Sequence, residues 1–151
     1  MKELTGRGSG NTAASPADCM ALLEAIDGYP TWAPDIVKEA AVLERDPAGH
    51  PTQARAKLHV ERGPLTRDFN LVFHVKVDPA GRIELRRIPH ESSDRERFDV
   101  TWRVDAAQSS RIALDLAANL DVPRFIPLGD VGDALAQQLV SAATRALQSP
   151  A

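Results

Sequence analysis

The chain has 151 residues, 43% of them hydrophobic and 26% charged, which is ordinary for one globular domain with its own core. The formal net charge of -3 at pH 7 argues against electrostatic binding of nucleic acid as the main activity. No apolar run approaches the roughly 18 residues of a membrane span, and the N-terminal stretch MKELTGRGSGNTAAS lacks the apolar core of a secretory signal. We therefore expect a single domain over residues 1–151 that is cytoplasmic, without a nucleic-acid partner and without an integral membrane segment.

The first predicted helix covers residues 15–26, SPADCMALLEAI. Ser15 stands where an N-cap would, and Pro16 occupies the first helical position, which suits its fixed backbone angle. The apolar residues recur at helical spacing and form one stripe made of Cys19, Leu22, Leu23 and Ile26. As the single cysteine of the chain, Cys19 cannot form an internal disulfide, which fits a reducing compartment, and we interpret it as a small buried side chain.

The stretch that follows, IDGYPTWAP at residues 26–34, is interrupted by glycine and proline too often for a regular helix or strand. It nevertheless carries Trp32, one of only two tryptophans in the chain. An aromatic side chain anchored at the end of a helix could close a core, or it could form the mouth of a pocket.

Six later stretches alternate apolar and polar side chains, which predicts strands joined as antiparallel hairpins. They cover residues 36–45, 53–61, 68–77, 82–88, 97–105 and 111–120. Their apolar positions share one face, and the larger inward side chains are Leu58, Phe69, Leu71, Phe73, Leu85, Phe98, Val100, Trp102 and Leu114. The N-terminal dozen residues predict only a weak further strand, because GRGSG has poor strand propensity.

The last predicted element is a long helix over residues 128–148, whose apolar stripe includes Leu135 and Leu139. A sheet that is apolar on one side must cover that face, and the simplest cover is a strongly curved sheet wrapped around this helix. The inward faces mix large and small side chains, so we expect an apolar cavity of the kind that binds small molecules. A fully packed core is the alternative.

The residues Asp27, Tyr29, Pro30 and Trp32 directly after the first helix, together with the order of elements, resemble the START-like superfamily, also called SRPBCC. The similarity is to its polyketide cyclase/dehydrase and coenzyme-Q-binding branch, and it covers roughly residues 6–148. It implies an α+β helix-grip fold, in which about seven antiparallel strands curve around the long C-terminal helix over a deep hydrophobic cavity.

The resemblance also implies that Trp32 lies in a short second helix or turn at the end of that cavity, either as a structural plug or as a ligand contact. Activities in the superfamily range from binding of lipids, quinones and hormones to aromatic polyketide cyclisation, so the fold alone does not settle the function. The first strand of the family alternates hydrophobic residues, whereas LTGRGSGNTAA is polar and glycine-rich, which predicts a short, irregular or edge strand.

Polar residues near the end of the 82–88 strand are the candidates for chemistry. If Ile83 and Leu85 face inward, strict alternation also turns Arg87 inward, where a guanidinium needs a carboxylate or a ligand anion. Such a group could stabilise an enolate-like transition state, unless a bulge or edge twist turns Arg87 outward. His90 and Glu91 follow and could act as general acid and base, or they are loop residues at the rim.

Motifs for other chemistry are missing from the sequence. The histidines His50, His59, His74 and His90 share no metal-ligand spacing. There is no GxSxG, no phosphate loop and no dinucleotide fingerprint. We therefore predict neither a metal site nor a cofactor.

Our leading hypothesis is a non-enzymatic protein that binds a small hydrophobic ligand, such as a lipid, a quinone or a polyketide-like molecule, between the sheet and the C-terminal helix. The candidate ligand contacts are Trp32, Leu58, Phe69, Leu71, Phe73, Leu85, Arg87, Phe98, Val100, Trp102, Leu114, Leu135 and Leu139. The sequence indicates no oligomeric state.

Two alternatives stay open. A polyketide cyclase or aromatase would need at least two polar groups inside the cavity, with Arg87, His90 and Glu91 as catalytic candidates. A protein-interaction module would use the same interior only as packed core, and a cavity too small for a ligand would favour it.

Overall fold

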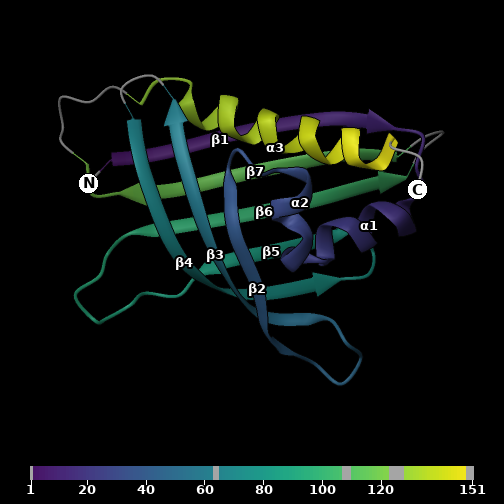
Figure 1. Cartoon of the computed structure of the whole chain (residues 1–151), viewed down its shortest axis with the longest axis horizontal. Helices are drawn as coiled ribbons and strands as arrows, with labels where there is room; N and C mark the ends of the chain where they lie inside the picture. Colours follow the sequence, from purple (N-terminus) through teal and green to yellow (C-terminus); the bar gives the residue numbers. More distant parts are fainter. Residues whose placement is uncertain (1, 63–64, 107–109, 123–127, 149–151) are drawn as a thin grey trace.

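The computed structural model describes residues 2–62, 65–106, 110–122 and 128–148. Their strands form one antiparallel sheet of seven strands in the order β1-β7-β6-β5-β4-β3-β2, which bends around the C-terminal helix (Figure 1). The strands are β1 (Lys2–Thr12), β2 (Val37–Arg45), β3 (Pro51–Arg62), β4 (Leu65–Asp78), β5 (Arg82–Arg87), β6 (Arg97–Ala106) and β7 (Ser110–Leu120). The helices are α1 (Pro16–Glu24), the 3₁₀ turn η1 (Ile26–Gly28), α2 (Tyr29–Trp32) and α3 (Val131–Gln148). The predicted α+β helix-grip fold is confirmed.

Helix α1 begins as its sequence predicts. The side-chain oxygen of Ser15 accepts a hydrogen bond from the backbone N–H of Asp18 over 3.1 Å, and Pro16 opens the first turn. Residues 26–34 form no long regular helix, but the short η1 and the single turn of α2 lie there, and α2 ends at Trp32, as the family resemblance implies. Pro30 is compatible with α2 because it sits in the first turn, where a backbone N–H would have no helical partner.

Strand β1 is longer and more regular than its composition suggests. It pairs with β7 at all 11 of its residues and forms one edge of the sheet. Its inward positions include Gly6 and Gly8, and α3 lies directly on them: a Cβ at Gly6 would overlap the backbone of Gly132, and a Cβ at Gly8 would lie 2.7 Å from Cα of Gln137. The low strand propensity of glycine is therefore overridden by the close approach of a helix backbone.

The start of α3 and the pairing of β2 with β3 both affect the shape of the interior. Helix α3 starts at Val131 rather than at residue 128, because Gly129 adopts a positive φ of 43° that ends helical geometry on its N-terminal side. The pairing of β2 with β3 shifts register at three places between Val37 and Arg45, and bulges of this kind bend a strand and strengthen its twist. Among the helices formed by the described residues, none combines the length and hydropathy needed to cross a bilayer.

We expect Gly6→Ala to destabilise the protein by about 1–3 kcal/mol or more, because the new methyl group must push the α3 backbone away from β1. The matched control is Gly10→Ala on the same strand face, where the added Cβ would meet only side-chain methyl groups of Val140 and Thr144 at 3.2 Å. Urea unfolding of both variants measures the difference. Equal losses of stability in the two variants would contradict the account of β1.

Candidate functional site

A cavity lies between the concave face of the sheet and helix α3. It has a volume of about 50 Å³, and its wall carries only aliphatic and aromatic side chains. The wall residues are Ile26, Tyr29, Ile36, Val37, Ala56, Leu58, Phe73, Leu85, Phe98, Val100, Trp102, Leu114, Leu116, Leu135 and Leu139. We call this space the inner cavity. Its surface favours an apolar occupant over an ionic one, because a charge buried there would lose its water without gaining a partner.

Nine of the thirteen candidate ligand contacts are on the wall of the inner cavity: Leu58, Phe73, Leu85, Phe98, Val100, Trp102, Leu114, Leu135 and Leu139. The other four, Trp32, Phe69, Leu71 and Arg87, lie elsewhere. That any of the nine contacts a ligand stays a prediction, which is taken up under the proposed function.

Six wall residues were not among the candidates: Ile26, Tyr29, Ile36, Val37, Ala56 and Leu116. Ala56 and Leu116 share the alternating inward faces of their strands, so the pattern could have identified them. Ile36 and Val37 follow the proline-rich turn and precede a register shift, where simple alternation gives no side-chain direction.

The inner cavity leaves part of its wall uncovered. Val100 comes from the middle of β6 and faces inward between the buried residues Phe98 and Trp102, yet it is only half-buried. Leu58 and Leu139 are also half-buried wall residues, on β3 and α3. The interior is thus less tightly filled at these positions than a continuous core would be.

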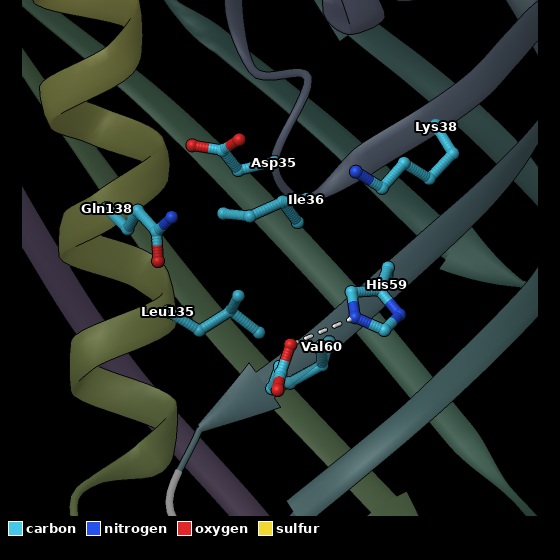
Figure 2. Close-up of a pocket in the computed structure, with 8 residues that line it drawn as sticks. Asp35, Ile36, Lys38, His59, Val60, Leu135 and Gln138 are labelled. Atoms are coloured by element: carbon cyan, nitrogen blue, oxygen red, sulfur yellow. Dashed lines mark hydrogen bonds and ion pairs between the residues drawn. The ribbon is translucent and has the colours of Figure 1, made fainter.

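A second, larger space opens beside the inner cavity, with a volume of about 410 Å³. We call it the outer hollow, and Figure 2 shows the residues around it: Asp35, Ile36, Lys38, His59, Val60, Glu61, Leu135 and Gln138. Ile36 and Leu135 belong to the walls of both spaces. These two aliphatic side chains, one before β2 and the other on α3, therefore form a partition between the polar outer hollow and the apolar inner cavity.

His59 and Lys38 of the outer hollow are already engaged with neighbouring groups. His59 contacts Asp68 at 2.5 Å and Glu61 at 3.5 Å, and these two carboxylates raise the pKa of its imidazole. The Nζ of Lys38 donates to the backbone carbonyl of Pro34 over 2.8 Å. The hollow therefore presents charges of both signs at the entrance to an apolar interior.

Three aromatic rings pack together near α2, and two of them, Tyr29 and Trp102, belong to the wall of the inner cavity. The ring centroids of Tyr29 and Trp32 are 4.8 Å apart, and Trp102 lies 6.5 Å from Tyr29 and 6.4 Å from Trp32. The hydroxyl of Tyr29 donates to the carbonyl of Leu23 over 2.5 Å, and burial raises its pKa well above the ordinary value. Tyr29 thus ties α2 to α1 and stays protonated at neutral pH.

Arg87 lies on the concave side of the sheet, opposite Phe73, as strict alternation predicts. Its side chain is only 5% exposed, and its guanidinium makes two bonds to the carboxylate of Asp94, at 2.6 and 3.1 Å. A third bond runs to the carbonyl of Glu96 over 2.9 Å. The carboxylate that a buried guanidinium requires is therefore supplied by the protein itself, and Arg87 is not on the wall of the inner cavity.

The other two catalytic candidates lie beside this ion pair at the connection between β5 and β6. His90 and Glu91 are exposed, and the Nε2 of His90 contacts the carbonyl of Asn70 at 3.2 Å. Together with Arg87 they border a separate open hollow that does not share a wall residue with the inner cavity. The structure thus brings Arg87, His90 and Glu91 close together, but away from the apolar interior.

A second ion pair continues this cluster. Arg67 donates twice to the carboxylate of Glu96, each time over 2.7 Å, and its guanidinium stacks over the ring of Phe69 at 4.5 Å. Arg87 holds the pKa of Asp94 far below its usual range, and Arg67 lowers the pKa of Glu96. Among the described residues, no group of three or more His, Cys, Asp or Glu side chains is placed to hold a metal ion.

The ion pair of Asp94 predicts a specific loss of stability in acid. Because the pKa of Asp94 is lowered in the folded state, its ionised carboxylate stabilises the fold at pH values above its unfolded-state pKa of about 4. This stabilisation is lost as the pH falls toward the lower pKa of the folded state. We expect the free energy of unfolding of the wild type to fall more steeply between about pH 4 and pH 2 than that of Asp94→Asn. Denaturant titrations across this range would show the two curves converging, whereas parallel curves would contradict the assignment.

Comparison with known proteins assigns the sequence to a family. The sequence matches the profile of the family described as polyketide cyclase / dehydrase and lipid transport over residues 12–148. A comparison with curated protein sequences finds no significant match.

Solved structures share the fold at low sequence identity. A START superfamily protein from Mycobacterium smegmatis superposes with a TM-score of 0.71 at 15% identity, over 97% of each chain. The major latex-like protein 151 from Panax ginseng gives 0.71 at 5% identity over 98% of each chain. The di-domain ARO/CYC protein BexL from the BE-7585A biosynthetic pathway gives 0.69 at 8% identity, over 99% of this chain and 51% of BexL. The chain has a START-like fold and belongs to the polyketide cyclase/dehydrase and lipid transport family.

Proposed function

We propose that the protein binds a small hydrophobic ligand, such as a lipid, a quinone or a polyketide-like molecule, in the inner cavity. The observation that carries this proposal is the wholly aliphatic and aromatic wall next to a solvent-open hollow. Burial of apolar ligand surface there would supply the binding free energy, at roughly 25 cal/mol per Å². The family description, which includes lipid transport, agrees with this chemistry.

The size of the inner cavity sets a condition on binding. Its volume of about 50 Å³ is room for one or two water molecules, whereas typical ligand pockets measure roughly 300–1,000 Å³. A ligand must therefore displace side chains as it enters. We expect this displacement at the partition of Ile36 and Leu135, because the outer hollow of about 410 Å³ lies next to it.

The cyclase alternative receives less support from the geometry. It needs polar groups that converge on the substrate, and none of the described wall residues carries an ionisable group except Tyr29, whose pKa is raised by burial. The guanidinium of Arg87 is neutralised by Asp94 outside the cavity. The small volume of the inner cavity is also what the packed-core alternative expects. The binding experiment must therefore separate ligand binding from a packed core.

Binding can be measured with the neutral fluorescent probe N-phenyl-1-naphthylamine, which gains fluorescence in apolar surroundings. We expect saturable binding to the wild type, and Val100→Phe should weaken it about tenfold or more, because a ring added in the inner cavity fills space that the probe needs. The matched control is Val72→Phe on the outer face of β4, which should bind like the wild type. No saturable binding to the wild type would support the packed-core alternative. Equal binding by both variants would place the probe elsewhere.

The partition predicts a kinetic effect. Leu135→Ala should speed up association of the same probe, because removal of the isobutyl group opens the way from the outer hollow to the inner cavity. Val131→Ala, one turn earlier on α3 and on the wall of neither space, is the control for general loosening of the helix. Stopped-flow fluorescence measures both rates. If the two variants associate equally fast, the partition is not the route of entry.

A further inference from the structure

Two side chains of opposite charge flank the partition on the side of the outer hollow. Asp35 directly precedes the partition residue Ile36, and Lys38 follows it by two positions. Both side chains are exposed and belong to the wall of the outer hollow. In Figure 2 the carboxylate of Asp35 is on the α3 side of Ile36, and the ammonium group of Lys38 is on the side of His59. A ligand that passes the partition therefore meets a negative group and a positive group at its outer end.

Neither charge has a close partner of opposite sign among the described residues. Asp35 forms no hydrogen bond or ion pair there, not even with Lys38. Lys38 donates from Nζ to the backbone carbonyl of Pro34 over 2.8 Å, which is an uncharged acceptor. The other two ionisable residues of the wall, His59 and Glu61, contact each other at 3.5 Å. Asp35 and Lys38 are thus the charges of the wall that a ligand would pair.

We propose that the ligand is a zwitterionic amphiphile with one apolar chain. The chain enters the inner cavity, the ammonium group of the head lies beside Asp35, and the anionic group of the head lies beside Lys38. This inference rests on the proposed function, and it adds the chemical class of the ligand and its orientation.

The contrast between the two spaces supports this orientation. The wall of the inner cavity is wholly aliphatic and aromatic, so a charged group inside would lose its water without gaining a partner. In the outer hollow of about 410 Å³, which is open to solvent, the head keeps much of its hydration. The apolar chain and the charged head of an amphiphile match this division.

The presence of both signs favours a zwitterion over a singly charged head. A cation beside Asp35 would also be repelled by Lys38, and an anion beside Lys38 would be repelled by Asp35. A wholly apolar ligand longer than the inner cavity would place apolar surface against both charges and gain no pairing from them. A head with two opposite charges gains attraction at both residues.

The experiment compares three probes with the same ten-carbon chain: decyl sulfobetaine, decyltrimethylammonium and decyl sulfonate. Their heads are zwitterionic, cationic and anionic. Isothermal titration calorimetry at low ionic strength, below the concentration at which each probe forms micelles, measures the three affinities. We expect decyl sulfobetaine to bind the wild type about 2- to 5-fold more tightly than either singly charged probe, as exposed ion pairs allow.

Two variants test the two halves of the head separately. Asp35→Asn should weaken decyl sulfobetaine and decyltrimethylammonium about 2- to 5-fold without weakening decyl sulfonate. Lys38→Gln should weaken decyl sulfobetaine and decyl sulfonate by a similar factor without weakening decyltrimethylammonium. Glu39→Gln is the matched control, because Glu39 is also exposed on β2 but lines neither space, and it should leave all three affinities unchanged.

A third variant tests where the chain lies. Val100→Phe should weaken all three probes by the same factor, because the added ring occupies the space of the chain and not that of the head. If Val100→Phe binds all three probes like the wild type while Asp35→Asn does not, the probes occupy only the outer hollow and the orientation is wrong.

The remaining outcomes separate this inference from the proposed function. If the three probes bind the wild type equally well, the protein binds amphiphiles but the zwitterion assignment is wrong. If Glu39→Gln weakens decyltrimethylammonium as much as Asp35→Asn does, the general surface potential explains the preference and the inference fails. If none of the probes binds and N-phenyl-1-naphthylamine does not bind either, the proposed function fails and the inference fails with it. If N-phenyl-1-naphthylamine alone binds, only the inference fails.

Discussion

The contact between the backbones of α3 and β1 determines the arrangement of the interior. Glycine at positions 6 and 8 of β1 and at position 132 of α3 removes the side chains that would otherwise hold helix and strand apart. The helix therefore lies mainly over β1 at one edge of the sheet and only next over β7 (Figure 1). The remaining strands must curve round to reach the other side of the helix, and the register shifts of β2 against β3 help them do so.

The inner cavity is thus bounded by interactions of unequal strength. On one side α3 is packed against a strand backbone, and any movement there would break many close contacts at once. On another side the rings of Tyr29, Trp32 and Trp102 pack against each other, with Tyr29 hydrogen-bonded to α1. The boundary formed by Ile36 and Leu135 consists of two aliphatic side chains, so their displacement would break no side-chain hydrogen bond.

Much of this structure follows from the sequence, because the strands obey a period of two and the C-terminal helix a period of 3.6. The alternation identified the six strands after α2 to within a few residues, and it placed Arg87 on the concave side. Propensity failed at β1, since the glycines that weaken an isolated strand are the residues that a helix resting on it requires. Local composition cannot show that β1 needs small residues, because this need comes from α3, more than 120 residues away along the chain. The backbone N–H of Arg7, for example, donates to the carboxylate of Asp133.

The candidate site was less predictable, because its polar groups depend on loop geometry. The sequence shows that an inward Arg87 needs an anion, but only the course of the β5–β6 connection makes Asp94 that anion, and Arg87 is not on the wall of the inner cavity. Similarly, Ile36 becomes a partition residue because of the path of the chain between α2 and β2. The period of a regular strand gives the inward direction of its side chains, but it does not give the course of loops and bulges.

The apolar wall of the inner cavity would give only limited selectivity in the proposed ligand binding. One methylene more or less in a hydrophobic pocket changes affinity only about 10- to 200-fold, and a pocket that adapts its side chains discriminates less than a rigid one. In a cavity that must expand to admit any ligand, shape is a weak criterion.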